Sequence, residues 1–429
     1  MKPRTKTIRF IIPIVLSLLV GCSSNSPTTS VPRDPTKAAE RVTQANQILV
    51  PRIGIIVARG GDSASLNLAS ASSLYREAVS FDDENLDAHF GLGITELLTV
   101  FSDTLLAGVG VFILPDFSAQ PVIAALNQGG YQQFIAGSFA KSKGTIKTLA
   151  RPDRAVAGIL AKRQVDYQPS YYQDLIETRA LPPLKDAISH LQRVTQNSAY
   201  AFLITPQLMG VDSGPTYRID LTEIYLLLAV AQYFTGEASM YASYNIDYNS
   251  SSQSSVVQAW QVSSSFLTLR PNGAQHMKDT RSSLIGFASS VKNAITFLMN
   301  EQPHKETDII TYNPSDQPML TSEIESMNSL VSEFSGPMTE NGVTINLVNL
   351  FDTPVTNFKA KVPAYTATAV SNGQGKYDAI LTWDASSFDT WIFPDPTFNG
   401  FLPGMTDPQL KQMFELNAAT WKPTVTIPG

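Results

Sequence analysis

The stretch that decides the fold is DLTEIYLLLAVAQYF, which covers residues 220–234. Asp220 and Glu223 form an Asp-x-x-Glu pattern, close to the capping box whose two side chains bond free backbone N–H groups at a helix start. Residues 224–234 are almost all apolar, and a helix that is apolar on every side is buried on every side. The stretch therefore predicts a central buried helix against which the other helices pack.

Apolar residues recur at helical spacing on both sides of this stretch. They predict helices over residues 36–50, 66–78, 88–98, 184–196, 256–269, 275–301, 320–334 and 407–417, with short helices over 120–127 and 153–163. We expect Pro51 to end the first helix and Asp62 or Ser63 to cap the second. Helices without alternating strands argue against a parallel α/β enzyme fold and favour a mainly α-helical array of irregular helical hairpins.

Small and large residues alternate across the predicted hairpin of residues 66–98. Small residues let paired helices approach closely, and large ones fill the groove between them. The pattern resembles a degenerate junction between two tetratricopeptide repeats, with Ala71, Tyr75 and Ala78 on the second helix of one repeat and His89, Leu92 and Gly93 on the first helix of the next. Asp83 stands where this family carries proline, and no earlier helix is visible at residues 53–61, so a plain helical hairpin is the alternative.

The sequence changes character from residue 342 onward. Residues 343–347 and 358–362 alternate between apolar and polar types, which predicts strands. Residues 394–406 are rich in turn formers and apolar side chains, so we expect an irregular segment that wraps across the helical body and buries its aromatic rings. The C-terminal part is therefore predicted to be a small irregular and β segment.

The N-terminus has the organisation of a secretory signal peptide. Basic residues at 2, 4, 6 and 9 precede an apolar stretch over residues 10–20. Leu19, Val20 and Gly21 then lead into Cys22, the only cysteine of the 429 residues. This order resembles a bacterial lipobox, which implies that the chain is cut before Cys22 and that its thiol is lipidated. The alternative is an incidental cysteine beside an ordinary signal peptide.

Small polar residues and prolines follow the cysteine and predict a flexible linker. Ser23 stands where inner-membrane lipoproteins of proteobacteria carry aspartate, so the resemblance favours the outer membrane, on its periplasmic face. We therefore divide the chain into a signal peptide (1–21), a linker (22–35), a helical body resembling tetratricopeptide repeats (36–340) and a C-terminal segment rich in aromatic residues and proline that packs on it (341–429).

Charge and motifs narrow the function classes. Cleavage removes four of the 31 lysines and arginines, leaving 27 against 37 acidic residues and a net charge of about −10, which disfavours nucleic acid as a partner. Gly-x-Ser-x-Gly and P-loop motifs are absent, and the single cysteine excludes thiolate metal sites. The sequence predicts no catalytic residue, metal or cofactor. None of the histidines has metal-ligand spacing; we expect His89 to pack between helices and His190, His276 and His304 to lie on surfaces or loops.

Two further patterns leave alternatives open. Asn245, Asp247 and Asn249, and also Asp395, Asn399 and Asp407, could bind calcium, although turns rich in Asn and Asp are far commoner than calcium sites. Tyr225, Tyr233 and Tyr241 recur every eight residues, close to one helix face. They either pack in the core with their hydroxyls on polar partners or line a groove for a peptide or a small ligand.

Two functional hypotheses follow. The first is a non-enzymatic, lipid-anchored envelope protein that binds a protein partner through its helical-repeat surface. The second is a periplasmic protein that binds a small molecule in a pocket of the helical body and works beside a transporter.

Overall fold

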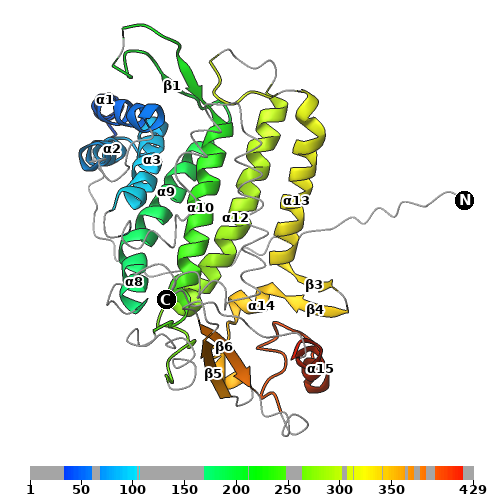
Figure 1. Cartoon of the computed structure of the whole chain (residues 1–429). Coiled ribbons are helices and arrows are strands. Elements are labelled where there is room, and N and C mark those ends of the chain that lie inside the picture. Colours follow the sequence, from blue (N-terminus) through cyan, green and yellow to red (C-terminus); the bar gives the residue numbers. More distant parts are fainter. Residues whose placement is uncertain are drawn as a thin grey trace, which may run out of the picture. The chain divides into compact units, whose positions relative to one another are not determined.

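The computed structural model describes residues 33–59, 68–103, 106, 169–210, 212–247, 263–301, 307–312, 314–340, 342–362, 366–371, 377–382 and 392–418. Within these residues the fold is mainly α-helical with small two-stranded sheets, as predicted (Figure 1). The predicted signal peptide, Cys22, and the helices at 120–127 and 153–163 lie outside them. No helix in these ranges has both the length and the apolar character needed to cross a bilayer.

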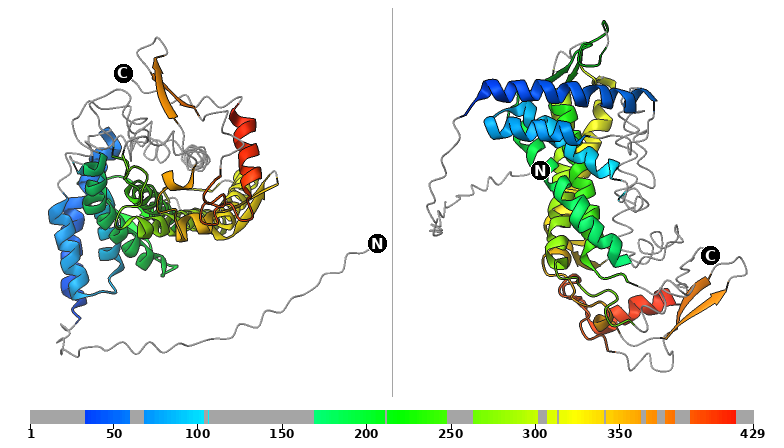
Figure 2. Two further views of the ribbon diagram at one scale, coloured as in Figure 1. Left: turned by 90° about the horizontal axis from the view of Figure 1, so that it is seen from below. Right: turned by 90° about the vertical axis from the view of Figure 1, so that its left-hand side faces the viewer.

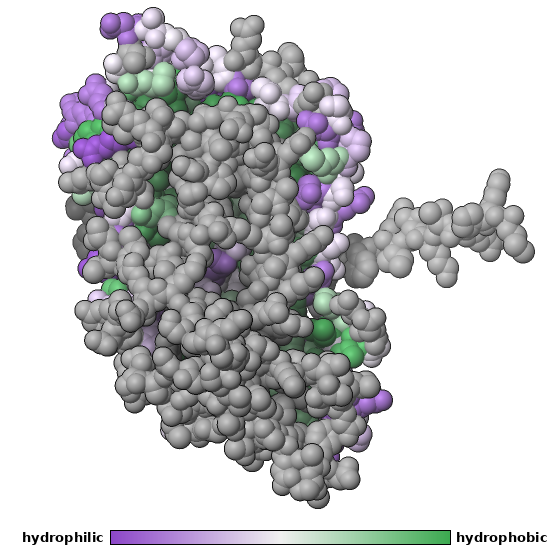
Figure 3. All heavy atoms as spheres, in the orientation of Figure 1, coloured by the Kyte–Doolittle hydropathy of each residue, from purple (hydrophilic) through white to green (hydrophobic). Residues whose placement is uncertain are grey.

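The first three helices pack on one another in chain order. They are α1 (Pro35–Arg59), α2 (Ala69–Phe81) and α3 (Leu86–Ser102). Asn85 caps α3 by accepting a hydrogen bond from Ala88 N. Figure 3 shows hydrophilic side chains on the outer side of α1 and α2. Their inner positions, such as Ala38, Val42 and Ala71, are buried in the core.

The prediction that Pro51 ends the first helix is wrong, because α1 continues through Pro51 to Arg59. Proline removes one backbone hydrogen bond, but Leu49 and Val50 directly before it are buried in the core. We infer that this packing keeps the helix continuous although one backbone hydrogen bond is missing. The predicted cap of the next helix, Asp62 or Ser63, lies outside the described residues, and α2 begins at Ala69.

A long helical run follows after residue 168. It consists of α8 (Pro169–Leu175), a π-helical turn η2 (Ile176–Ala180) and α9 (Leu181–Thr195). The amphipathic spacing predicted only its last part. Leu184, Ala187 and Leu191 are fully buried, and α9 packs on α3 on one side and on α10 on the other.

The predicted central helix is α10 (Leu221–Ser243), and each of its residues is buried or half-buried. It packs between α9 and α12 (Gly273–Asn300), and α12 packs on α13 (Gln317–Ser335), as Figures 1 and 2 show. The predicted helices at 275–301 and 320–334 are thereby confirmed. Among the described residues, three clusters of buried apolar residues form the core of the helical body, and α10 contributes to each, for example through Ile224, Phe234 and Ala229.

Three antiparallel hairpins are present in the described residues. They pair β1 (Phe202–Ile204) with β2 (Tyr217–Ile219), β3 (Pro337–Glu340) with β4 (Val343–Asn346), and β5 (Thr366–Ser371) with β6 (Tyr377–Thr382). The predicted strand at 343–347 is β4. The expected boundary after residue 340 coincides with the end of β3, so it separates the two strands of this hairpin.

Two secondary-structure predictions are wrong. Residues 358–362 form a 3₁₀ turn, η4 (Lys359–Lys361), because Lys361 N bonds the carbonyl of Phe358 and both lysine side chains bind distant oxygens. Residues 263–269 of the predicted helix 256–269 form turns and short bridges. Leu267 there has a φ of 59°, which a helix does not allow. Residues 256–262 are outside the described ranges.

The C-terminal segment contacts the helical body through α14 (Leu347–Asp352), whose Phe351 is fully buried between α12 and α13. A short 3₁₀ turn, η3 (Pro314–Asp316), precedes α13. Residues 392–406 are irregular, as predicted, and Asn346 N donates to Phe401 O. They bury Phe393 and Met405 with Leu410 of α15 (Asp407–Ala418), the predicted closing helix.

Candidate functional site

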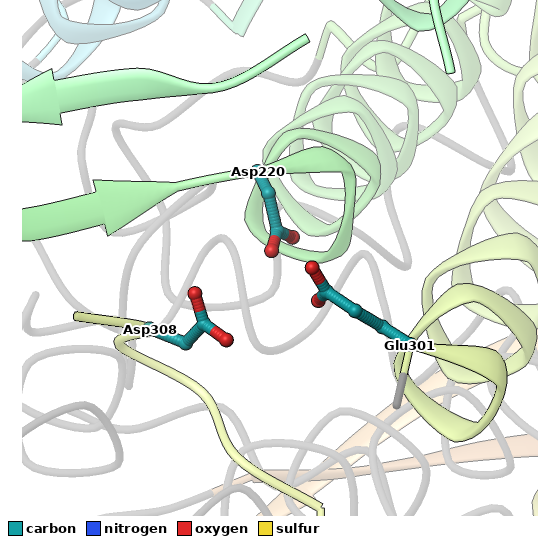
Figure 4. A group of neighbouring side chains, drawn as sticks. All are labelled: Asp220, Glu301 and Asp308. Atoms are coloured by element: carbon teal, nitrogen blue, oxygen red, sulfur yellow. The ribbon is translucent and has the colours of Figure 1, made fainter. Parts of the chain in front are cut away.

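A buried arginine joins four segments at the N-terminal end of α10. Arg218 of β2 donates through one guanidinium nitrogen, Nη1, to Asp220 Oδ2 at 2.8 Å, to Glu301 Oε1 at 2.7 Å and to Asp308 Oδ1 at 3.0 Å. Asp220 precedes α10, Glu301 follows α12, and Asp308 lies in the segment 307–312. Figure 4 shows the three carboxylates pointing toward one another.

The predicted capping box is part of this network. Asp220 accepts from Thr222 N at 2.8 Å, and Glu223 Oε2 accepts from Asp220 N at 2.9 Å. The other oxygen of Glu223 accepts from Ile310 N at 3.1 Å, which holds the segment 307–312 against the helix start. Burial, together with the charge of Asp220, raises the pKa of Glu223 to about 8. Glu223 therefore holds a proton more tightly in the folded state than in the unfolded chain.

The three carboxylates lie close enough to hold a metal ion, with ligand oxygens within 4.8 Å of one another. However, the guanidinium of Arg218 already contacts all three, so it takes the place that a cation would occupy. Burial opposes the charge of Arg218, but its bonds to Glu301 and Asp308 outweigh that effect and raise its pKa. We therefore interpret the cluster as an ion-pair network that joins neighbouring segments, rather than as a metal centre.

A second polar network surrounds the π-helical turn. Glu177 of η2 accepts from His276 Nε2 at 2.6 Å and from Arg270 Nη2 at 2.8 Å. Arg270 also binds Asp174 and Gln173 of α8, and Gln173 donates to the carbonyls of residues 241 and 244 at the end of α10. The expectation that His276 lies on a surface or loop is wrong, because it is 8% exposed and paired with Glu177. The π-helical turn widens the helix there and brings Glu177 to the start of α12.

The six residues of the predicted repeat junction all lie in the core. They are Ala71, Tyr75, Ala78, His89, Leu92 and Gly93. Tyr75 is fully buried and donates its hydroxyl to Asn46 Oδ1 at 2.6 Å. A Cβ atom on Gly93 would lie 2.7 Å from Leu191 Cγ, so this small residue permits the close approach of α3 and α9. Gly91 has the same role opposite Tyr75, which the sequence pattern did not single out.

His89 has a partner that its sequence surroundings do not reveal. Its Nδ1 lies 2.9 Å from Nδ1 of His190, which is 101 positions later and belongs to α9. Its Nε2 lies 2.8 Å from the carbonyl oxygen of Asp83. His190 is half-buried, and His304 is outside the described residues. Because pattern searches compare nearby positions, they could not bring these two imidazoles together.

The predicted tyrosine stripe is half-buried along α10. Tyr225, Tyr233 and Tyr241 are half-buried. Val230 and Glu237, which continue the same helical spacing, are half-buried too. Tyr233 donates to Glu237 Oε1 at 2.6 Å and packs its ring against Phe287 and Phe234. Burial, and then the charge of Glu237, raises the pKa of Tyr241 well above its usual range. The packing of Tyr233 agrees with a core role, with its hydroxyl on a polar partner.

Protein groups satisfy the described residues of the two possible calcium loops. Asn245 accepts from Asp247 N, and Asp247 accepts from Ser170 N at the start of α8; Asn249 is outside the described residues. Burial opposes the charge of Asp395, but bonds from Lys361, Thr397 and Asn399 outweigh it and hold its pKa well below the usual range. Asp407 accepts from Phe393 N instead of joining them. We propose no calcium site at either loop.

No protein-family model matches this chain, and no curated protein or solved structure is significantly similar to it.

Proposed function

We propose that this protein is a non-enzymatic, lipid-anchored protein of the bacterial envelope that serves as a scaffold for a protein partner. The observation that carries the proposal is the order of helix packing. Helices pack successively along the chain: α1 on α2, α2 on α3, α3 on α9, α9 on α10, α10 on α12 and α12 on α13. Arrays built this way hold extended surfaces for partners, and the resemblance of residues 66–98 to tetratricopeptide repeats favours the same class.

The polar clusters support binding rather than catalysis. Arg218 and Arg270 each satisfy several carboxylates or amides of neighbouring segments. These charged groups thus hold the fold together, whereas an active site needs groups directed at a substrate. Both networks are explained as contacts that fix the ends of α10 and α12.

The β1–β2 hairpin is the surface that we assign to the partner. Leu203 is 50% exposed and Tyr217 is 41% exposed, and they are two of the four large apolar side chains that are exposed in the described residues. Leu203 pairs with Arg218 and Tyr217 pairs with Ile204, so the two exposed side chains lie on opposite faces of the hairpin, and a partner would have to contact both faces. The hairpin is fixed to the body by Phe202 in the core and by Arg218 in the carboxylate cluster.

Site-specific photo-crosslinking in the native envelope tests this assignment. A photoreactive amino acid at position 203 or 217 should give one discrete protein adduct. The same amino acid at Ser329, an exposed position of α13, serves as the control and should not. Equal adduct patterns from all three positions, or no adduct from the hairpin, would count against a scaffold that binds through this hairpin.

The lipid anchor has its own test. Cys22→Ser removes the only thiol. We expect an uncleaved precursor or release of the protein from the membrane fraction, because no thiol remains to carry the lipid chains that anchor the protein. Normal processing and unchanged membrane association would contradict lipidation at Cys22.

The half-buried tyrosine stripe of α10 favours a second candidate, a periplasmic small-molecule-binding protein that works beside a transporter. Tyr225 would then face the ligand, whereas Tyr233 keeps its ring on Phe287 and its hydroxyl on Glu237. Native mass spectrometry of protein released from envelopes would show a bound small molecule in this case, and replacing Tyr225 by Ala would reduce its occupancy.

A further inference from the structure

His89 and His190 bring two imidazole nitrogens together across two separate helices. The Nδ1 atoms are 2.9 Å apart, and the ring centroids are 5.1 Å apart. His89 lies in α3 and is buried, while His190 lies in α9 and is half-exposed. His89 therefore lies in the core, and solvent reaches the pair through His190.

The proton positions follow from the acceptors. A carbonyl oxygen only accepts, so His89 must carry its proton on Nε2, which lies 2.8 Å from Asp83 O. Neutral His89 then has its lone pair on Nδ1, directed at His190, whose Nδ1 must donate. If the proton of His190 moves to its own Nε2, both rings stay neutral and both Nδ1 atoms present lone pairs.

This arrangement has the features of a metal-ligand pair. Metal-binding histidines usually donate their other ring nitrogen to a carbonyl or carboxylate, as His89 does to Asp83. Two nitrogens at about 2.05 Å from an ion are about 2.9 Å apart at a right angle and about 3.3 Å apart in tetrahedral geometry. The observed 2.9 Å thus needs rotation of the rings but little movement of the helices.

The charges around the pair act in both directions on a cation. Asp186 lies one helical turn before His190 on α9 and interacts favourably with a positive charge at that imidazole. Arg76 opposes this effect, but it is paired with the buried carboxylate of Glu96.

We propose that His89 and His190 bind a divalent transition-metal ion of the Zn²⁺, Ni²⁺ or Cu²⁺ class, with water filling the remaining positions. Imidazole is a preferred ligand for these ions. The ion would fasten α3 to α9 in place of the hydrogen bond between the rings. This inference does not depend on the proposed scaffold function.

Zn²⁺ titration of the full chain, produced without a histidine tag, tests the site. Calorimetry should show one equivalent of Zn²⁺ bound, and His89→Gln or His190→Gln should weaken the binding at least tenfold. His276→Gln is the matched control, since it changes another buried helical histidine and should leave the affinity unchanged. No binding by the wild-type chain, or equal binding by His190→Gln, would show that the pair is only a hydrogen bond.

A second measurement uses only the wild-type chain, in case the variants do not fold. One equivalent of Cu²⁺ should give an electron paramagnetic resonance spectrum with superhyperfine coupling to two imidazole nitrogens. Coupling to one nitrogen or to none would overturn the proposal.

Discussion

At the scale of single residues, Gly91 has the tightest surroundings of the repeat-like hairpin. A Cβ atom there would lie 2.2 Å from ring carbons of Tyr75. Tyr75 is fully buried and its hydroxyl is bonded to Asn46, so the ring has no free direction in which to move. We predict that Gly91→Ala lowers the free energy of unfolding by about 3 kcal/mol, the upper part of the range for overpacking.

Urea unfolding measures this loss, with Gly336→Ala as the control. No heavy atom lies within 4 Å of a Cβ placed on Gly336, and its φ of −167° is ordinary extended backbone. The control should change stability by less than about 0.5 kcal/mol. Equal effects of the two substitutions would mean that α2 and α3 separate more easily than their packing indicates.

Glu223 leads to a prediction about pH. Its pKa rises from 4.5 to about 8 on folding, so the folded state binds the proton more tightly than the unfolded chain does. The resulting stability is fully present below pH 4.5 and is lost as the pH rises through about 8. We predict that the free energy of unfolding falls by on the order of 4 kcal/mol between pH 5 and pH 9 because of this group.

Glu223→Gln isolates that contribution, because glutamine does not titrate. Its amide nitrogen cannot accept from a backbone N–H as the second carboxyl oxygen does, which should cost about 1 kcal/mol at pH 6. At pH 9 the variant should equal or exceed the wild type in stability. A constant difference between the two proteins from pH 5 to pH 9 would contradict the raised pKa.

At the scale of elements, Arg218 determines how segments meet at the N-terminal end of α10. Arg218→Met would leave Asp220, Asp308 and Glu301 without their shared cation in a largely buried site. Breaking a buried ion pair in this way typically costs 3–5 kcal/mol, and we predict a loss in that range for the free energy of unfolding. Arg218→Lys should lose less, because it keeps the charge but not the guanidinium geometry.

Thermal unfolding at two pH values checks the cause. Burial raises the pKa of Glu301, so this carboxylate gains a proton as the pH falls and the repulsion in the cluster decreases; the deficit of Arg218→Met should therefore shrink between pH 7 and pH 4.5. A deficit that is the same at both values would indicate lost packing rather than lost charge compensation.

Elements with a strong local signal could be predicted from the sequence, and elements that depend on distant contacts could not. The capping box of Asp220 and Glu223 and the apolar stretch after it define α10, and both lie within a few residues of each other. By contrast, Arg218 meets Glu301 across 83 positions and Asp308 across 90, which no local pattern encodes. The errors at Pro51 and at residues 358–362 have the same origin, because tertiary packing and distant hydrogen bonds overrode local preference there.

At the scale of the whole molecule, α10 connects the three core clusters. Ile224 belongs to the first, Phe234 to the second and Ala229 to the third, so no cluster can come apart fully without disturbing this helix. The all-apolar stretch predicted that the helix is central, but not which helices contact it. Residues 103–180 separate α3 from α9 in the chain, yet these helices pack directly on each other.

From this position we expect α10 to be the last part of the described fold to open. Its residues are all buried or half-buried, whereas α13 has many exposed positions and only Leu320, Met327, Leu330 and Phe334 buried. Amides of fully packed elements exchange only through global unfolding, and those of peripheral elements exchange through smaller openings.

We predict that peptides from residues 221–243 exchange deuterium at least tenfold more slowly than peptides from 317–335, measured by mass spectrometry at neutral pH. The measured exchange rate of each peptide is first divided by the intrinsic exchange rate of its sequence. If α13 is protected as strongly as α10, the array unfolds as one cooperative body, and the central helix has no special part in its stability.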